Sequence, residues 1–264
     1  MKYLRNYWLS FITDILNAEA DYIKFQGVKY VSNKVLEIPG SIWASDAGFD
    51  LSTLGYQEAK YKQLSRNYFA EDNIKAAKEK LGSREGSKFS SVGIILNANP
   101  KRKSSQGHCM LAMAVSRAQK SKPRITVFYR ITEVICKFGA DLLFLKNKVI
   151  PEIIGDEEPE AVSFHFANVF LSPLFIPIII PYIEDIPIFL DIIRNTNDEK
   201  VFKGSIWALS IPFIRSNPDY YNYRTRRHMH QMGIKNYGKI SKEHYTKVKK
   251  YIEKEKPEWI ESAE

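Results

Sequence analysis

The chain has 264 residues, of which 44% are hydrophobic and 13% aromatic, a composition typical of a globular protein and not of a disordered one. Its net charge of +9 favours anionic partners such as nucleotides, a polyanionic cofactor or nucleic acid, although scattered surface lysines give the same balance. The two cysteines, Cys109 and Cys136, are too few for a disulfide framework or a cysteine-rich zinc site. We therefore expect a reducing, cytoplasmic setting.

Neither a signal peptide nor a membrane span is predicted. The N-terminal segment carries Asp14, Glu19 and Asp21, which a signal peptide would lack. The most apolar stretch, residues 169–190, is interrupted by four prolines and two carboxylates, so it is a poor candidate for crossing a bilayer.

The first third of the chain predicts helices around one β segment. Apolar residues at helical spacing predict an amphipathic helix over 3–20, and a β-rich run follows over 22–38. Residues 41–61 look loop-rich, with Trp43 as an aromatic anchor. A further helix is expected over 71–81, ended by Gly82.

The central segment predicts strands followed by a helix. Short strands are expected over 92–97, 110–115 and 125–129, and helical spacing of apolar residues predicts a helix over 131–145. An acidic surface loop and an apolar element over 161–172 come next. From residue 216 the chain becomes basic and aromatic, with a charged helix over 241–255, so we expect one α/β domain over 1–215 with an extension over 216–264.

Cys109 is the first candidate for chemistry. A thiolate is a strong nucleophile, and cations such as Arg102, Lys103 and Arg130, together with His108, would lower the pKa of the thiol. The alternative is a buried structural cysteine, which is the commoner state of a free cysteine. Cys136 lies in an apolar helical pattern and is expected in the core.

Arg130, Glu133 and Asp141 are the next candidates. An arginine at a strand end is placed to bind phosphate or carboxylate in a bidentate manner, or else to pair with Glu133 three residues later. Asp141 lies between Ala140 and Leu142, where a carboxylate must find hydrogen-bond donors or stay protonated. It is a candidate for contacting the edge of a base, or alternatively an ordinary aspartate on a helix surface.

Several common motifs are missing. The sequence has no HExxH or CxxC spacing, so no metal site is predicted, and no GxGxxG or P-loop pattern that would indicate a common nucleotide-binding fold. The basic run RTRRHMH at 224–230 could contact nucleic acid or ligand phosphates, or form a solvated face.

These segments, taken in order, resemble the thymidylate synthase and deoxycytidylate hydroxymethylase superfamily. The order is IILNANP, then GHC, two strands, YRITE and FGAD, with 21 positions from Cys109 to Arg130 and 11 from Arg130 to Asp141. Upstream, SIWASDAGFD is similar to an Ile-Trp-Asp segment of the family, and downstream HFANVFLS falls where the family binds the sugar. The resemblance covers roughly residues 3–172.

The resemblance implies a twisted mixed β-sheet flanked by helices, in a homodimer that pairs through the sheet face. Cys109, next to His108, would add to C6 of a pyrimidine, and Asp141 would favour a cytosine base. Substrate contacts would come from Arg130 on the phosphate, and from Asn168 and Trp43. Glu133 would contact the one-carbon donor, 5,10-methylenetetrahydrofolate.

The sequence also departs from this family. His108 precedes the cysteine, Ile131 stands where a phosphate-binding serine is expected, and Ser91 and Val92 stand where paired arginines are expected. Two alternatives therefore stay open: a divergent, non-catalytic relative that binds nucleotide or nucleic acid, and an unrelated cysteine enzyme.

Overall fold

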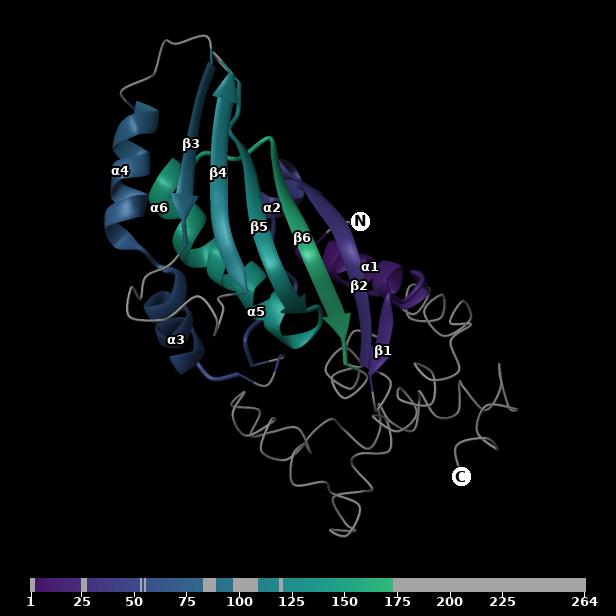
Figure 1. Ribbon diagram of the computed structural model, residues 1–264. Helices are drawn as coiled ribbons and strands as arrows, with labels where there is room; N and C mark the ends of the chain where they lie inside the picture. Colours follow the sequence, from purple (N-terminus) through teal and green to yellow (C-terminus); the bar gives the residue numbers. More distant parts are fainter. Residues whose placement is uncertain are drawn as a thin grey trace, which may run out of the picture.

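A mixed, open β-sheet forms the centre of the fold. The computed structural model describes residues 3–24, 28–52, 54, 56–82, 89–96, 109–118 and 121–172. Its strands are β1 (Tyr22–Lys24), β2 (Val28–Pro39), β3 (Phe89–Ile95), β4 (Met110–Ala118), β5 (Arg124–Glu133) and β6 (Ala161–Leu171). They lie in the order β1-β2-β6-β5-β4-β3, so five long strands are extended by a short edge strand (Figure 1). Neighbouring strands are antiparallel except β5 and β6, which are parallel.

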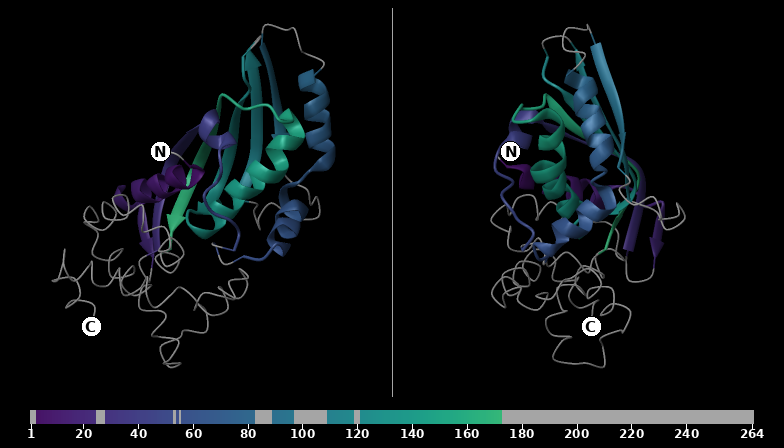
Figure 2. Two further views of the ribbon diagram at one scale, coloured as in Figure 1. Left: turned by 180° about the vertical axis from the view of Figure 1, so that it is seen from behind. Right: turned by 90° about the vertical axis from the view of Figure 1, so that its left-hand side faces the viewer.

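The described helices cover one face of this sheet (Figure 2). They are α1 (Leu4–Asn17), α2 (Gly40–Ala44), α3 (Ala59–Tyr68), α4 (Glu71–Gly82), α5 (Cys136–Phe144), a π-helical turn η3 (Leu145–Val149) and α6 (Ile150–Ile154). The segment α5-η3-α6 connects β5 to β6, as a parallel strand pair requires. This crossover places the start of α5 beside the end of β5.

Aromatic side chains join the helices to the sheet. Phe138 of α5 is fully buried and makes edge-to-face contacts with rings of α1, β5 and β6: Phe11, Tyr129, Phe164 and Phe166, at centroid distances of 5.1–5.9 Å. Such pairs contribute roughly 0.5–1.5 kcal/mol each beyond the burial of their area. The Trp8 Nε1 of α1 donates a hydrogen bond to the Val134 carbonyl, 2.8 Å away, which links α1 to the turn before α5.

The predicted α/β class, with a mixed sheet flanked by helices, is confirmed. The helices predicted over 3–20 and 71–81 are also confirmed, as α1 and α4. Two predictions were wrong. The loop-rich reading of 41–61 misses α2 and the start of α3, and residues 131–133 extend β5 instead of beginning a helix. The hydrophobic pattern of α3 has only Leu64 and Tyr68 buried, too few to reveal the helix. The predicted elements beyond residue 172, including the extension over 216–264, lie outside the described residues.

In three neighbouring strands, β2, β6 and β5, the alternation of buried and exposed side chains shifts by one residue. We infer that the sheet bends there. In β2, Leu36 and Ile38 face inward on one side of Asn33, and Val31 faces inward on the other. Asn33 has φ +53°, a left-handed conformation that a non-glycine residue adopts uncommonly and that allows this change. The same shift occurs in β6, where Phe166 and Val169 are both buried although they are three residues apart and not two.

The bend reaches β4 and β5 as well. Arg130 lies in the same row as the change in β6, and β4 has a register shift between Met110 and Ala112. A bulge of this kind bends a strand and redirects its side chains. Cys109 directly precedes this shift, and its carbonyl accepts the N–H of Arg130 in β5.

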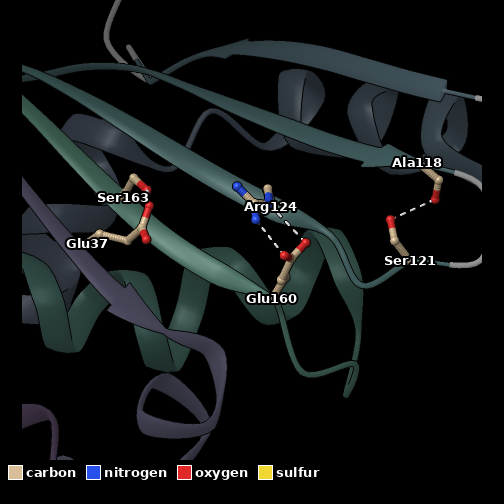
Figure 3. A network of polar contacts seen from close by, with 6 residues as sticks. All are labelled: Glu37, Ala118, Ser121, Arg124, Glu160 and Ser163. Carbon is tan, nitrogen blue, oxygen red and sulfur yellow. Dashed lines mark hydrogen bonds and ion pairs between the residues drawn. The ribbon is translucent and has the colours of Figure 1, made fainter.

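At the opposite end of the sheet, ion pairs join the loop before β6 to the β4–β5 hairpin. The acidic loop before β6 pairs with basic residues of the β4–β5 hairpin: Glu157 with Arg117, Glu158 with Lys122 and Glu160 with Arg124. Figure 3 shows the two-pronged Arg124–Glu160 pair, with Nε–Oε2 at 2.9 Å and Nη2–Oε1 at 2.5 Å. Exposed ion pairs add little stability singly, but these three orient the loop that leads into β6.

We predict that Gly40→Ala destabilises the fold severely. A Cβ at residue 40 would lie 1.5 Å from the Pro159 carbonyl oxygen, a backbone atom, and the Gly40 N–H donates to the Glu160 carbonyl at 2.9 Å. The chain would have to separate α2 from the loop before β6, so we expect a loss of more than about 3 kcal/mol in urea unfolding.

The matched control is Gly82→Ala, because a Cβ there meets nothing within 4 Å. Its stability should be unchanged or slightly higher, since alanine favours a helix over glycine. An equal stability for Gly40→Ala and the unmodified protein would show that α2 does not pack as described.

Candidate functional site

Cys109 is held between β5 and α3 by its backbone. Its carbonyl accepts the Arg130 N–H at 2.8 Å, and its N–H donates to the Tyr68 hydroxyl at 3.2 Å. The residue is half-buried and packs against the edge of the core. A thiol that is fixed in position and still partly exposed has the placement that a nucleophile requires.

Helix α5 brings a carboxylate and a cation to the same place. Asp141 and Lys137 are four residues apart, so they lie on one face of the helix. Asp141 is only 4% exposed, and its charge acts on the Cys109 thiol, as does that of Lys137. The sequence-predicted pair of Cys109 and Asp141 is therefore brought together, with Arg130 also close enough to act on the thiol.

The Tyr129 hydroxyl lies among these groups. Tyr129 is 2% exposed, and Asp141, Tyr68 and Cys109 all act on its hydroxyl electrostatically. The Tyr129 hydroxyl lies close enough to the Asp141 carboxyl for a hydrogen bond between them to raise the pKa of Tyr129 and lower that of Asp141.

Helix α3 forms the second wall of the site. Lys60, Leu64 and Tyr68 follow one another at intervals of four and share a helical face. Leu64 is buried, and Tyr68 reaches Cys109. The Lys60 ammonium lies 4.5 Å from the centre of the Tyr56 ring, an arrangement that stabilises a cation, and its positive charge acts on Asp141.

Burial controls the protonation of the cluster. It raises the pKa of the Cys109 thiol above its ordinary value, and the charge of Asp141 raises it further, against the lowering effects of Lys137 and Arg130. Burial also raises the pKa of Asp141 to about 7, although Lys60 and Lys137 oppose it. At neutral pH the Cys109 sulfur is therefore mainly a thiol, and Asp141 is partly protonated.

Glu133 has a structural role: it caps the start of α5. It is fully buried, and its carboxylate accepts the backbone N–H groups of Ile135 at 3.1 Å and Cys136 at 2.6 Å. Burial raises its pKa to about 7 in spite of these hydrogen bonds. Its oxygens satisfy the free N–H groups of the helix, so the predicted contact with a one-carbon donor has no geometric basis here.

The other predicted substrate contacts, Trp43 and Asn168, are held by contacts within the fold. Trp43 is 3% exposed, packs near Phe164, and its carbonyl accepts the Lys146 ammonium, so its ring belongs to the core at the far end of α5. The Asn168 Oδ1 accepts the Ser32 hydroxyl at 2.9 Å, which ties it to β2. His108 lies outside the described residues.

Cys136 is a core residue, as the sequence predicts. It is fully buried, and its sulfur lies 3.3 Å from the Tyr56 hydroxyl. Burial raises its pKa strongly, so it is unreactive in the folded protein. Cys109 is consequently the one thiol of the chain that reagents can reach without unfolding.

Sequence analysis missed Lys60, Tyr68, Tyr129 and Lys137. Two of them lie on α3, a helix that was not predicted, because only Leu64 and Tyr68 among its residues are buried. Lys137 could have been found from its interval of four to Asp141. Tyr129 precedes Arg130 and was read only as a strand residue.

The raised pKa values of Glu133 and Asp141 predict that stability falls as pH rises. Each folded-state pKa is about 7, above ordinary values of 4.5 and 3.8, so the folded protein binds more protons than the unfolded chain between about pH 4 and pH 7. In that window the free energy of unfolding should fall by about 1.4 kcal/mol per pH unit for each group. Urea unfolding at pH 5, 6, 7 and 8 measures this slope.

Asp141→Asn should reduce the slope and make the protein more stable than the unmodified form at pH 8, because the amide cannot ionise. Asp156→Asn is the control, since Asp156 is exposed on the loop before β6. A slope for Asp141→Asn that equals that of the unmodified protein would contradict the burial of an ionisable Asp141.

No protein-family model matches the chain, and no curated protein matches its sequence. Within the described segments, no helix is long and apolar enough to cross a membrane. Nor do three or more His, Cys, Asp or Glu side chains of those segments gather as a metal site. The cluster around Cys109 and Asp141 is the group of described residues on which we base the proposal below.

Proposed function

We propose that the protein transfers a one-carbon unit to C5 of a pyrimidine nucleotide, as a hydroxymethyl- or methyltransferase of the thymidylate synthase type. The observation that carries the proposal is the convergence of Cys109, Asp141 and Arg130. Cys109 directly precedes β4, Arg130 lies in β5 and Asp141 in α5, and the charges of Asp141 and Arg130 both act on the Cys109 thiol. Their order and spacing led to the same three residues in the sequence.

Each residue has a separate role in the proposed reaction. The Cys109 sulfur adds to C6 of the ring, which moves electron density to C5 and makes that carbon a nucleophile. Once C5 has bonded to the one-carbon unit, loss of the C5 proton with expulsion of the sulfur restores the C5–C6 double bond and the aromatic ring. Asp141 faces the polar edge of the base, and cytosine is the favoured substrate because a carboxyl group can both accept from its amino group and donate to N3.

Arg130 is the proposed phosphate contact. It is exposed at the end of β5, one hydrogen bond away from the Cys109 backbone, and a guanidinium binds phosphate through paired N–H groups. The phosphate would therefore lie on the open side of the cluster and the base on its buried side.

The one-carbon donor is proposed as a reduced folate only through the resemblance. Glu133, the residue assigned to it, has no exposed surface and is engaged by the N–H groups of α5. The residues present therefore do not fit a folate contact at this position, and no step is derived through the donor.

A binding protein without catalysis is the second candidate, and the protonated state of Cys109 favours it. Burial and Asp141 both hold the sulfur as a thiol, the opposite of the cationic surroundings that activate catalytic cysteines. Such a protein would bind a nucleotide at the same cluster, or nucleic acid through the basic residues 224–230, which lie outside the described residues.

A homodimer that pairs through the open face of the sheet is part of the proposal. That face, opposite the described helices, exposes large apolar side chains of four long strands: Val35 at 57%, Ile95 at 66%, Leu111 at 45% and Phe128 at 40%. Large apolar side chains exposed together on one face of a sheet are typical of a protein interface.

Release of tritium from C5-tritiated dCMP and dUMP tests the proposed chemistry. We expect the unmodified protein to release tritium in the presence of methylenetetrahydrofolate, and Cys109→Ala to lose at least about a thousandfold in rate, as expected for a removed nucleophile. Cys136→Ala is the control, because that sulfur is buried away from ligands.

Turnover by Cys109→Ala at an undiminished rate would rule out the covalent route. Nucleotide binding by the unmodified protein without tritium release from either substrate would instead favour the second candidate.

Charge on the open sheet face should dissociate the dimer. We predict that Val35→Glu combined with Phe128→Glu gives a monomer in sedimentation velocity, because two carboxylates would be buried at the interface. Lys78→Glu, on the exposed side of α4, is the control and should leave the dimer intact. A monomeric unmodified protein, or a dimer that survives the double substitution, would contradict pairing through this face.

A further inference from the structure

We propose that Tyr68 positions Cys109 for the reaction. The Tyr68 hydroxyl oxygen accepts the backbone N–H of Cys109 at 3.2 Å, and this hydrogen bond fixes the main chain from which the sulfur projects. The two residues are 41 positions apart, so the contact joins separate parts of the fold. The role of Cys109 as the nucleophile rests on the proposed function, and Tyr68, which acts through Cys109, is a positioning residue.

The pairing of the described strands leaves the Cys109 N–H outside the sheet. Strand β4 begins at Met110, where its pairing with β5 starts, and its pairing with β3 starts only at Ala112. The Cys109 carbonyl still accepts the Arg130 N–H at 2.8 Å. A backbone donor in a partly buried place needs an acceptor, and the Tyr68 hydroxyl takes the place of the missing strand neighbour.

Tyr68 is itself held in place, which allows it to fix another residue. It is the last residue of α3 and is 7% exposed, and its carbonyl accepts the Ala70 N–H at 3.0 Å in the short connection to α4. At the other end of the same helix, the Tyr61 hydroxyl accepts the Asn147 Nδ2–H of η3 at 3.0 Å. Helix α3 therefore links η3 to the start of β4, and Tyr68 carries this support to the main chain beside the Cys109 sulfur.

The acid–base properties of Tyr68 agree with this geometry. Burial raises the pKa of its hydroxyl, and the N–H groups of Cys109 and Met110 oppose that rise. Two successive N–H groups therefore face one oxygen. Removal of the hydroxyl would take an acceptor away from the start of β4 at the residue that carries the thiol.

Hydrogen exchange of the Cys109 N–H tests this contact in the full chain without any substrate. Tyr68→Phe keeps the ring and removes the hydroxyl. By NMR on isotope-labelled protein, the Cys109 N–H of this variant should exchange about tenfold faster, relative to the N–H groups in the middle of β5, whose exchange follows global stability. Sucrose in the buffer keeps a weakened variant folded during the measurement.

Tyr68→Phe should also slow the release of tritium from C5-tritiated dCMP. We expect kcat to fall about ten- to a hundredfold, because the sulfur is no longer held at its reacting position, whereas KM for dCMP should stay within about twofold. A purely structural role of Tyr68 would lower the amount of folded protein and leave kcat per folded molecule unchanged.

Tyr61→Phe is the matched control. It removes a hydroxyl from the same helix, about two turns from Tyr68, where the hydrogen-bond partner is Asn147. Both the exchange rate of the Cys109 N–H and kcat should be unchanged in this variant.

An unchanged exchange rate of the Cys109 N–H in folded Tyr68→Phe would overturn the inference, as would an active Tyr68→Phe enzyme with an undiminished kcat. No release of tritium by the unmodified protein would contradict the proposed function instead. The exchange measurement would still decide whether Tyr68 fixes Cys109.

Discussion

Two acids, the Cys109 thiol and the Asp141 carboxyl, lie in the same poorly solvated cluster, and the proposed chemistry depends on this arrangement. Burial raises the pKa of both groups, and a negative charge on one disfavours a charge on the other. Lys60, Lys137 and Arg130 surround the pair and limit the cost. At neutral pH the Cys109 sulfur is therefore mainly a thiol, and the neighbouring cations oppose the effect of burial only in part.

The sheet and its crossover create this proximity. The bend through β2, β6 and β5 and the register shift in β4 redirect the strand ends toward the helical layer, and Glu133 anchors the first N–H groups of α5 at the end of β5. Asp141 lies little more than one turn into that helix, and α3 closes the other side. Ion pairs of the acidic loop hold the opposite end of the sheet, away from the site.

Much of the fold and of the candidate site could be predicted from the sequence, and the predictions that failed did so for physical reasons. Cys109, Arg130 and Asp141 were found because residue type and spacing indicate nucleophile, cation and buried carboxylate. Glu133 and Trp43 were assigned to ligands by resemblance, and burial gives them tasks in the fold instead. Lys60 and Tyr68 were missed because α3 is mostly polar and its helix depends on contacts made after folding.

A crystal structure of the protein with dCMP bound tests the central claim most directly. The account predicts that the cytosine ring lies against the Cys109 sulfur, with C6 closest to Sγ, its N3 and amino group on the Asp141 carboxyl, and its phosphate toward Arg130. A nucleotide bound elsewhere, with Cys109 and Asp141 still packed as in the free protein, would contradict it.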